Sequence, residues 1–245
     1  MTERFGAESP GSKQLKFHTQ TAGSTLTAQQ IENNVVRVAY QALAAVLGGT
    51  QSLHTNGKDE ALSLPTEQSV RTALRTQQIL AHESGAADTI DPLAGSYYIE
   101  HLTDMLEEQA FEILDDIDSR GGMRRAIEDQ WVQGQIQEVA FERQREVESG
   151  ERIIVGVNEY VVDEEPIEDI EEVSETEQAR QRETVQQLRA DRNSTEVDEA
   201  LTALESAAAS DTNLMPFIID AVKAYATTGE ICDALRAEFG EYTGL

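Results

Sequence analysis

An alternation of short apolar runs and helical patterns between residues 13 and 98 constrains the fold of this chain more than any other feature. The runs at 13–20 and 50–56 each predict a strand, and each is followed by a loop and then by a helical pattern. Thr89-Ile90 predicts a third, very short strand. Strand–loop–helix alternation is typical of a parallel α/β architecture, and we expect that fold class here.

Helices are predicted over most of the remaining chain. Thr27 is a suitable N-cap for the first, and Gly48-Gly49 ends it. Pro65-Thr66 opens the second helix. The stretch at 152–162 is β-like and predicts a short hairpin or an extended arm. The predicted helices cover residues 27–47, 65–84, 99–120, 123–149, 178–209 and 214–238.

Changes in composition and hydrophobic pattern along the sequence predict four segments. Residues 1–98 carry the α/β pattern, and residues 99–162 are a helical continuation with the short β arm. Residues 163–177 are dominated by Asp and Glu and contain no Lys or Arg, which predicts a solvated acidic linker. Residues 178–245 form a C-terminal helical segment.

The excess of acidic over basic residues limits the partners that the protein can bind. The chain has 46 Asp and Glu residues against 19 Lys and Arg, a formal net charge of -27. This charge repels phosphate, so a nucleic-acid partner is excluded. A surface of one sign also destabilises the folded state through self-repulsion, which molar salt screens. We therefore expect a halophilic protein, with an acidic protein of an ordinary cytosol as the alternative.

Three further features limit the class of protein. Cys232 is the only cysteine, so an internal disulfide is excluded. No 18-residue apolar run occurs, so we expect no membrane span and no membrane partner. The first residues are polar and unlike a signal peptide, which predicts a cytoplasmic location.

Polar side chains stand where the first two predicted strands meet their loops, at 17–20 and 54–56. The carboxyl ends of strands form the active-site face of a (β/α) barrel, so these residues indicate a site; ordinary turn chemistry is the alternative. No second ligand pattern accompanies His18 and His54, so no metal site is predicted. Asp59-Glu60 could accept bonds from ribose hydroxyls or could be surface charge.

Longer motifs add a specific resemblance. They are HTQTAGSTLT at 18–27, ENNVVR at 32–37, GGTQSLHTN at 48–56, DEALSLPT at 59–66, DPLAGSYY at 91–98, GGM at 121–123 and IVGVN at 154–158. In order and spacing they resemble the motifs of the methylmalonyl-CoA mutase family, such as HxQTSGxSLT and DPxGGSY, with Ala94 replacing a Gly. The resemblance runs from about residue 4 to about residue 240.

The resemblance implies a fold and an activity. The fold is the C-terminal portion of a (β/α)8 TIM barrel, with about three of its strands, followed by a mostly helical extension. The activity is that of an isomerase component: adenosylcobalamin-dependent radical 1,2-rearrangement of (R)-methylmalonyl-CoA to succinyl-CoA. The alternatives are a mutase acting on isobutyryl-, ethylmalonyl- or 2-hydroxyisobutyryl-CoA, or a non-catalytic remnant that serves as an assembly module.

The resemblance also implies partners and site residues. The sequence lacks the first barrel strands, the residues that bind the acyl group, and an Asp-x-His-x-x-Gly cobalt-ligand motif. We therefore expect three partners: the N-terminal part of the barrel, a separate cobalamin-binding subunit, and an acyl-CoA substrate. The catalytic residues that handle the acyl group are expected outside this chain. The implied cofactor-binding residues are Gln20, Gly23, Glu60, Ala61 and Leu64, and the implied cavity-lining residues are His18, Gln51, His54 and Asn56.

The net charge generates the first testable prediction. We expect the fold to be loosened in dilute buffer and stabilised by molar KCl, because the Debye length falls to about 3 Å at 1 M salt. Circular dichroism melts across a KCl titration measure this effect. A melting temperature that stays constant between about 0.1 M and several molar KCl would contradict the expected salt adaptation.

Overall fold

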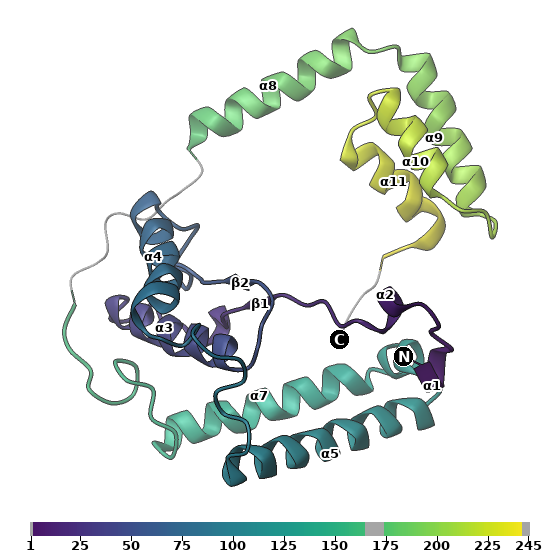
Figure 1. Ribbon diagram of the computed structural model, residues 1–245. Helices are drawn as coiled ribbons and strands as arrows, with labels where there is room; N and C mark the ends of the chain where they lie inside the picture. Colours follow the sequence, from purple (N-terminus) through teal and green to yellow (C-terminus); the bar gives the residue numbers. More distant parts are fainter. Residues whose placement is uncertain (1, 165–173, 242–245) are drawn as a thin grey trace. The chain divides into compact units, whose positions relative to one another are not determined.

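A parallel pair of short strands is the only sheet within residues 2–164 and 174–241, the residues that the computed structural model describes (Figure 1). Strand β1 (Thr19–Gln20) pairs with β2 (Leu53–His54), so that Thr19 lies opposite Leu53 and Gln20 opposite His54. Parallel strands require a crossover connection, and α3 (Glu32–Leu47) supplies it. The predicted parallel βα arrangement is therefore confirmed for the first two strands.

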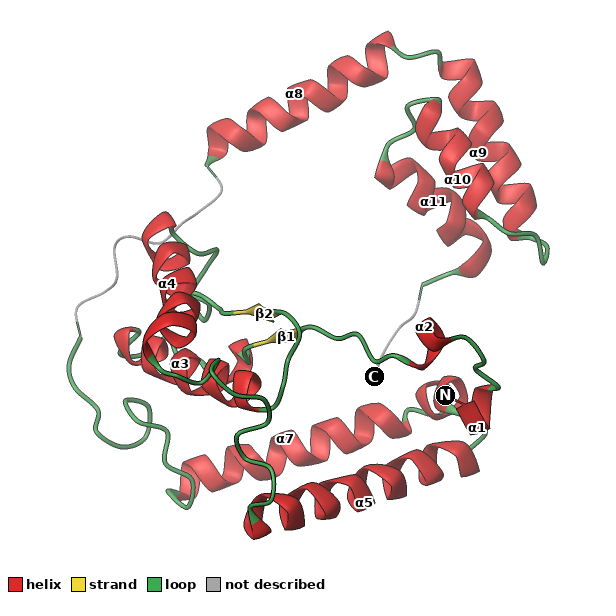
Figure 2. Cartoon of the chain, in the orientation of Figure 1, coloured by secondary structure: helices red, strands yellow, loops and turns green. Residues whose placement is uncertain are grey.

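Helix dominates the rest of the chain (Figure 2). The chain divides into two compact units, residues 1–172 and 173–245. The finer division at residues 98 and 162 stays a prediction, and residues 165–173 of the predicted acidic linker lie outside the described residues. The helices of the first unit are α1 (Thr2–Phe5), α2 (Pro10–Lys13), the 3-10 turn η1 (Gly23–Thr25), α3 (Glu32–Leu47), α4 (Glu67–Glu83), α5 (Tyr97–Ser119), α6 (Met123–Glu128) and α7 (Trp131–Ser149).

The strand predictions need two corrections. The predicted first strand at 13–20 is reduced to its last two residues, because Ser9 caps a helix that Pro10 starts and the residues between this helix and β1 are exposed. No third strand forms at Thr89-Ile90, where Ile90 is 96% exposed. A two-residue segment becomes a strand only when a neighbouring strand pairs with it, and the described residues offer this segment none. The described residues thus contain two strands rather than about three.

Helices α3 and α4 pack against each other beside the sheet. The buried apolar residues of the two helices are small or medium-sized: Val38, Ala42 and Ala73. Helix α4 begins as predicted, with the Thr66 hydroxyl accepting a hydrogen bond from the Ser69 N–H. Helix α3 begins at Glu32 rather than after Thr27, for a reason that lies in the site described below.

The helical segment after residue 96 has more breaks than expected. Gly121-Gly122 ends α5 as predicted, but the predicted helix over 123–149 is divided between α6 and α7. Gln130 adopts a left-handed conformation with φ of 61°, which a continuous helix cannot contain. The stretch at 152–162, predicted as a short hairpin or an extended arm, forms no regular strand; it has one isolated bridge, Val155 to Glu159, on either side of a turn that contains Gly156.

The second unit is a small helical assembly. Each of the two helices predicted there is in fact a pair, because Asn193 and Thr227 cap new helices inside the predicted ranges. Buried residues from α9, α10 and α11, with Leu204 fully enclosed, form its hydrophobic core. Its helices are α8 (Glu175–Asp191), α9 (Ser194–Ala208), α10 (Met215–Lys223) and α11 (Thr228–Phe239).

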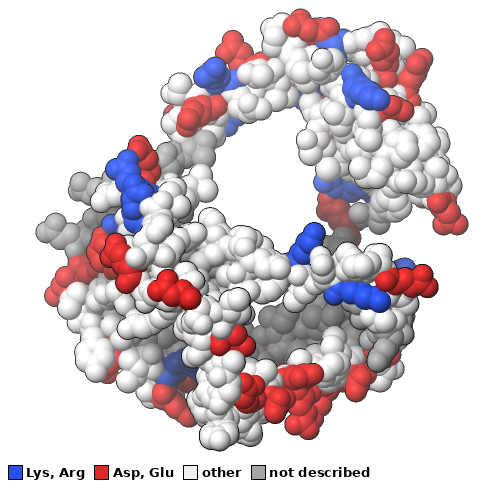
Figure 3. All heavy atoms as spheres, in the orientation of Figure 1, with Lys and Arg blue, Asp and Glu red and all other residues white. Residues whose placement is uncertain are grey.

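Surface properties agree with the composition. Acidic side chains outnumber basic ones on the face that Figure 3 shows.

None of the helices in the described ranges combines the length and the apolar composition needed to cross a bilayer.

In the second unit, an ion pair joins the junction between α8 and α9 to helix α11. Both Nη atoms of Arg192 donate to the Glu230 carboxylate, at 2.6 and 2.7 Å, and the Thr227 N–H donates to it at 2.8 Å. The hydrogen bonds from Arg192 are the main reason that the pKa of Glu230 falls from 4.5 to about 2; burial opposes them and the bonds from Thr227 reinforce them. Because the folded pKa is depressed, the stabilisation is present above about pH 4.5 and is lost as the pH falls toward 2.

We therefore expect Glu230→Gln to lower the free energy of unfolding of the second unit by about 2 kcal/mol at neutral pH. The difference from the unmutated chain should shrink as the pH falls from 4.5 toward about 2, where Glu230 itself becomes protonated. Thermal unfolding of the full chain by circular dichroism measures both values. Glu199→Gln, at an exposed acid of α9, is the matched control, and equal losses in the two variants would contradict the assignment.

Candidate functional site

Five polar side chains share one face of the two-stranded sheet. Gln20 and His54 lie opposite each other in register, so their side chains point to the same side. Two residues earlier along each segment, and so on the same side, His18 Nδ1 lies 2.7 Å from Ser52 Oγ. Beyond the strands, Gln20 Nε2 donates to Asn56 Oδ1 at 3.0 Å. The face presented by His18, Gln20, Ser52, His54 and Asn56 is therefore polar along its whole length.

This polar face differs from the packed interior of an ordinary barrel. The inward side chains of barrel strands are mostly bulky and branched, and they fill the interior. Hydrogen-bonding side chains in that position would carry a large desolvation cost in a dry core. The arrangement instead suits a wall that borders water or a polar ligand.

The loops that follow the two strands meet at Gly23. A Cβ atom at this position would lie 2.8 Å from Asn56 Nδ2, and 3.2 Å from both Cγ and Oε1 of Glu60. Real Cβ atoms essentially never approach other atoms as closely as the first of these distances. A side chain at residue 23 would therefore have to push Asn56 or Glu60 away. The structure thus brings Gln20, Gly23, Asn56 and Glu60 together in what we call the strand-end corner.

Asn56 supplies an unpaired donor to this corner. Its backbone N–H donates to Thr21 Oγ1 at 2.9 Å, and its Oδ1 accepts the bond from Gln20. The residue is only 2% exposed, yet its Nδ2 has no hydrogen-bond partner within the part of the chain that the structure describes. A buried donor without a partner costs about 1–3 kcal/mol, so this group is suited to an acceptor that a ligand brings.

The structure gives different roles to Asp59 and Glu60, which the sequence alone could not distinguish. Asp59 is buried; its Oδ1 accepts from the Ser69 hydroxyl at 2.6 Å and its Oδ2 from the Thr66 N–H at 2.9 Å. It therefore holds the loop against the start of α4. Glu60 is exposed, and its carboxylate has no hydrogen-bond or ion-pair partner among the described residues. Of the two, only Glu60 is free to bind a ligand.

The rest of this loop carries the other two predicted cofactor residues. Ala61 and Leu64 are both exposed, and Leu64 follows a turn in which the N–H groups of residues 62 and 63 donate to the Asp59 carbonyl. His54 and Glu60 also border a pocket of about 230 Å³ against α4, where Val70 and Leu74 supply an apolar wall. The loop thus presents one carboxylate among apolar side chains.

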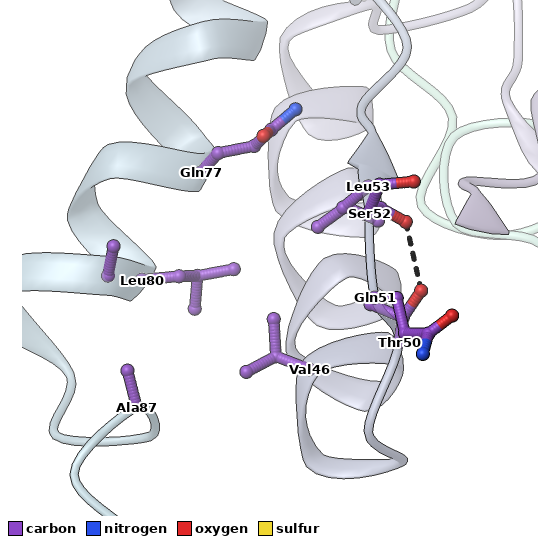
Figure 4. Close-up of a pocket in the computed structure, with 9 residues that line it drawn as sticks. Val46, Thr50, Gln51, Ser52, Leu53, Gln77, Leu80 and Ala87 are labelled. Atoms are coloured by element: carbon purple, nitrogen blue, oxygen red, sulfur yellow. Dashed lines mark hydrogen bonds between the residues drawn. The ribbon is translucent and has the colours of Figure 1, made fainter. Parts of the chain in front are cut away.

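Gln51 lies away from the strand-end corner. It precedes β2, at the opposite end of the strand from Asn56, and its Oε1 accepts a hydrogen bond from the Phe17 N–H at 2.9 Å. Figure 4 shows it beside a second pocket, of about 220 Å³, near the C-terminal parts of α3 and α4. That pocket is lined by Val46, Thr50, Gln51, Ser52, Leu53, Gln77, Leu80, Ala81 and Ala87.

Sequence reasoning did not single out Asn34, which is fully buried behind the strand-end corner. The sequence pattern could have identified it. Asn34, Val38 and Ala42 follow one another at the four-residue spacing of a buried helix face, and a buried amide needs polar partners. Within residues 2–164 and 174–241, no group of three or more His, Cys, Asp or Glu side chains could hold a metal ion.

The close approach at Gly23 can be tested directly. We expect Gly23→Ala to lower the free energy of unfolding by about 1–3 kcal/mol, because the added methyl group must displace Asn56 or Glu60. Gly11→Ala is the matched control, because a Cβ there meets no atom within 4 Å. Thermal melts of the full chain compare the two variants. The close packing would be contradicted if Gly23→Ala were as well tolerated as Gly11→Ala.

Comparison with known proteins gives a consistent result. The family model described as Methylmalonyl-CoA mutase matches residues 1–241. The chain is 48% identical over 244 residues to the 2-hydroxyisobutanoyl-CoA mutase large subunit of Aquincola tertiaricarbonis, covering 99% of this chain and 43% of that protein. It is 46% identical over 239 residues to the methylmalonyl-CoA mutase of Escherichia coli K12, covering 97% of this chain and 34% of that protein. The chain therefore spans well under half the length of these relatives.

Proposed function

Because this chain belongs to the methylmalonyl-CoA mutase family, we propose that it forms part of the barrel of an adenosylcobalamin-dependent acyl-CoA mutase. The family is a TIM-barrel family, and in such barrels the carboxyl ends of the strands carry the active site. The observation that supports the proposal most directly is the strand-end corner. Gly23, Asn56 and Glu60 meet there, at the ends of two neighbouring parallel strands.

The corner has the properties that a nucleoside-bearing cofactor requires. The free Glu60 carboxylate can accept bonds from two ribose hydroxyls, and such charge-assisted bonds are strong. The unpaired Nδ2 of Asn56 can donate to an acceptor of the same ligand. Gly23, which has no side chain, lets Asn56 and Glu60 lie close against the backbone of the first loop. Bound adenosylcobalamin would supply the radical chemistry of a 1,2-rearrangement, while these residues would bind and orient it and exclude water.

The proposal includes further barrel segments and a partner subunit. Helices α3 and α4 leave large apolar side chains uncovered, including Val36, Tyr40, Val70 and Leu74. Exposed apolar surface of this kind supports an interface with other barrel units, in the same polypeptide or in another. The relative from Aquincola tertiaricarbonis is named as a large subunit, which supports a separate cobalamin-binding subunit. The 245-residue chain by itself is expected to show no turnover.

Two substrates fit the proposal. The first is (R)-methylmalonyl-CoA, converted to succinyl-CoA. The second is 2-hydroxyisobutyryl-CoA, favoured by 48% identity to a mutase named for that acyl group against 46% to one named for methylmalonyl-CoA. Assays of the assembled enzyme with both acyl-CoA thioesters distinguish them by the ratio of their kcat/KM values.

The proposed role of Glu60 gives a direct prediction. Glu60→Gln keeps the shape of the side chain and removes its charge, so it should weaken adenosylcobalamin binding by roughly 10–100-fold in the assembled enzyme. The affinity for acyl-CoA should barely change, because other residues hold the thioester. Titration of the enzyme with the cofactor at high salt, at saturating acyl-CoA, measures the effect.

The matched control is Glu83→Gln, at an exposed acid in the last turn of α4. If Glu60 were one more surface acid of a salt-adapted protein, the two variants would behave alike. Indistinguishable cofactor dependence would therefore remove Glu60 from the proposed site.

A further inference from the structure

We propose that Asn34 is a positioning residue that holds the two loops of the strand-end corner at a fixed separation and thereby sets the cofactor affinity. The inference rests on the proposed function, because it assigns Asn34 an effect on the same site. The hydrogen bonds of the Asn34 side chain within the described residues go to Thr27, Arg37 and Lys58 and not to the corner residues themselves. Asn34 acts through the backbone of the loops that carry Gly23 and Glu60.

The side chain of Asn34 joins three parts of the chain. From its place in the first turn of α3, its Nδ2 donates to the Thr27 carbonyl and to the Lys58 carbonyl, both at 2.8 Å. Its Oδ1 accepts from the Thr27 N–H at 3.1 Å. Thr27 belongs to the loop that carries Gly23, and Lys58 to the loop that carries Glu60. One amide therefore ties both loops to α3.

The orientation of this amide is determined by its neighbours. Arg37 Nη1 donates to Asn34 Oδ1 at 2.7 Å and to Thr27 Oγ1 at 2.9 Å, while Nη2 donates to the Val155 carbonyl at 2.7 Å. If the amide were flipped, its NH2 group would face two donors and its oxygen would face two carbonyls. Every hydrogen-bonding position of Asn34 is therefore used, and only one orientation satisfies them all. The N–H and carbonyl of Thr27 bond to Asn34, and its Oγ1 accepts from Arg37. Because these groups are already hydrogen-bonded, Thr27 does not cap α3.

Glu60 stands next to both anchors of its loop. On its N-terminal side, the Lys58 carbonyl is held by Asn34. The adjoining Asp59 carboxylate is held by Ser69 and by the backbone of Thr66. Without the bond to Asn34, the loop would keep its bonds to α4 and the exposed ion pair between Lys58 Nζ and the Glu32 carboxylate of α3. Its backbone, which carries Glu60, would no longer be held to α3, and the separation of Glu60 from Gly23 would be less strictly defined.

Asn34→Asp tests this role with little change of shape. It replaces the donating NH2 group by an oxygen that repels the two carbonyls, while Oδ1 can still accept from Arg37. Asn34→Ser is a second, less disruptive variant, because its hydroxyl can donate to one carbonyl. Asn33→Asp is the matched control: it makes the same chemical change one residue earlier, where the amide Nδ2 donates to Gln30 and, among the described residues, to no backbone group of either loop.

Two measurements separate positioning from general stability. Amide hydrogen exchange of the full chain reports on the tether, and we expect faster exchange at residues 57–64 in both Asn34 variants but not in Asn33→Asp. Equilibrium titration of the assembled enzyme with adenosylcobalamin and, separately, with acyl-CoA reports on the site. We expect cofactor affinity to fall about tenfold in a folded Asn34 variant, with acyl-CoA affinity unchanged.

The outcomes are distinguishable. Unchanged cofactor affinity in a folded Asn34 variant, or equal weakening of cofactor and acyl-CoA binding, would overturn the positioning role. Unchanged exchange at residues 57–64 would overturn the tether itself. Glu60→Gln serves as the reference in the same titration. If Glu60→Gln left the cofactor affinity unchanged, the proposed function would fail at this site, while the exchange data would still decide whether Asn34 tethers the loop.

Discussion

The parallel pairing of β1 with β2 is the interaction on which the rest of the candidate site depends. The Thr19 N–H donates to the Ser52 carbonyl and the Thr21 N–H to the His54 carbonyl, each at 3.0 Å, and these bonds fix the register. A slip of one residue would turn the polar side chains of one strand to the opposite face. Because the register holds, two loops distant in the sequence end beside each other, and Asn56 comes within reach of Gly23.

The residues of the strand-end corner stabilise one another only in part, through the hydrogen bond from Gln20 to Asn56. Asn56 keeps a buried donor unpaired, and Glu60 is a free carboxylate in a chain with a net charge of -27. The supporting residues Asn34 and Asp59, in contrast, have hydrogen-bond partners for their side chains. Their bonds offset the cost of the unpaired groups in the corner. Well-satisfied support around an unsatisfied group is the pattern expected of a binding site rather than of a core.

Local features of the fold could be predicted from the sequence, and features that depend on distant contacts could not. Thr66 and Gly121-Gly122 mark helix ends because the hydrogen bonds and backbone angles that end a helix are local. Thr27 looked like a helix cap, but Asn34 occupies its backbone groups. The strand–loop–helix pattern predicted that Asp59 and Glu60 lie in the loop after the second strand, whereas only the structure shows that Asp59 is used for support and that Gln51 lies at the other end of its strand.

In the proposed enzyme, the two loops after β1 and β2 form one wall of the cofactor site. Hydrogen exchange of the assembled mutase, with and without adenosylcobalamin, tests this arrangement. We expect slower exchange on cofactor addition at residues 20–26 and 56–64, and no change at 48–51 beside the pocket of Figure 4. Exchange that stays the same in both loops, or that slows equally at 48–51, would contradict it.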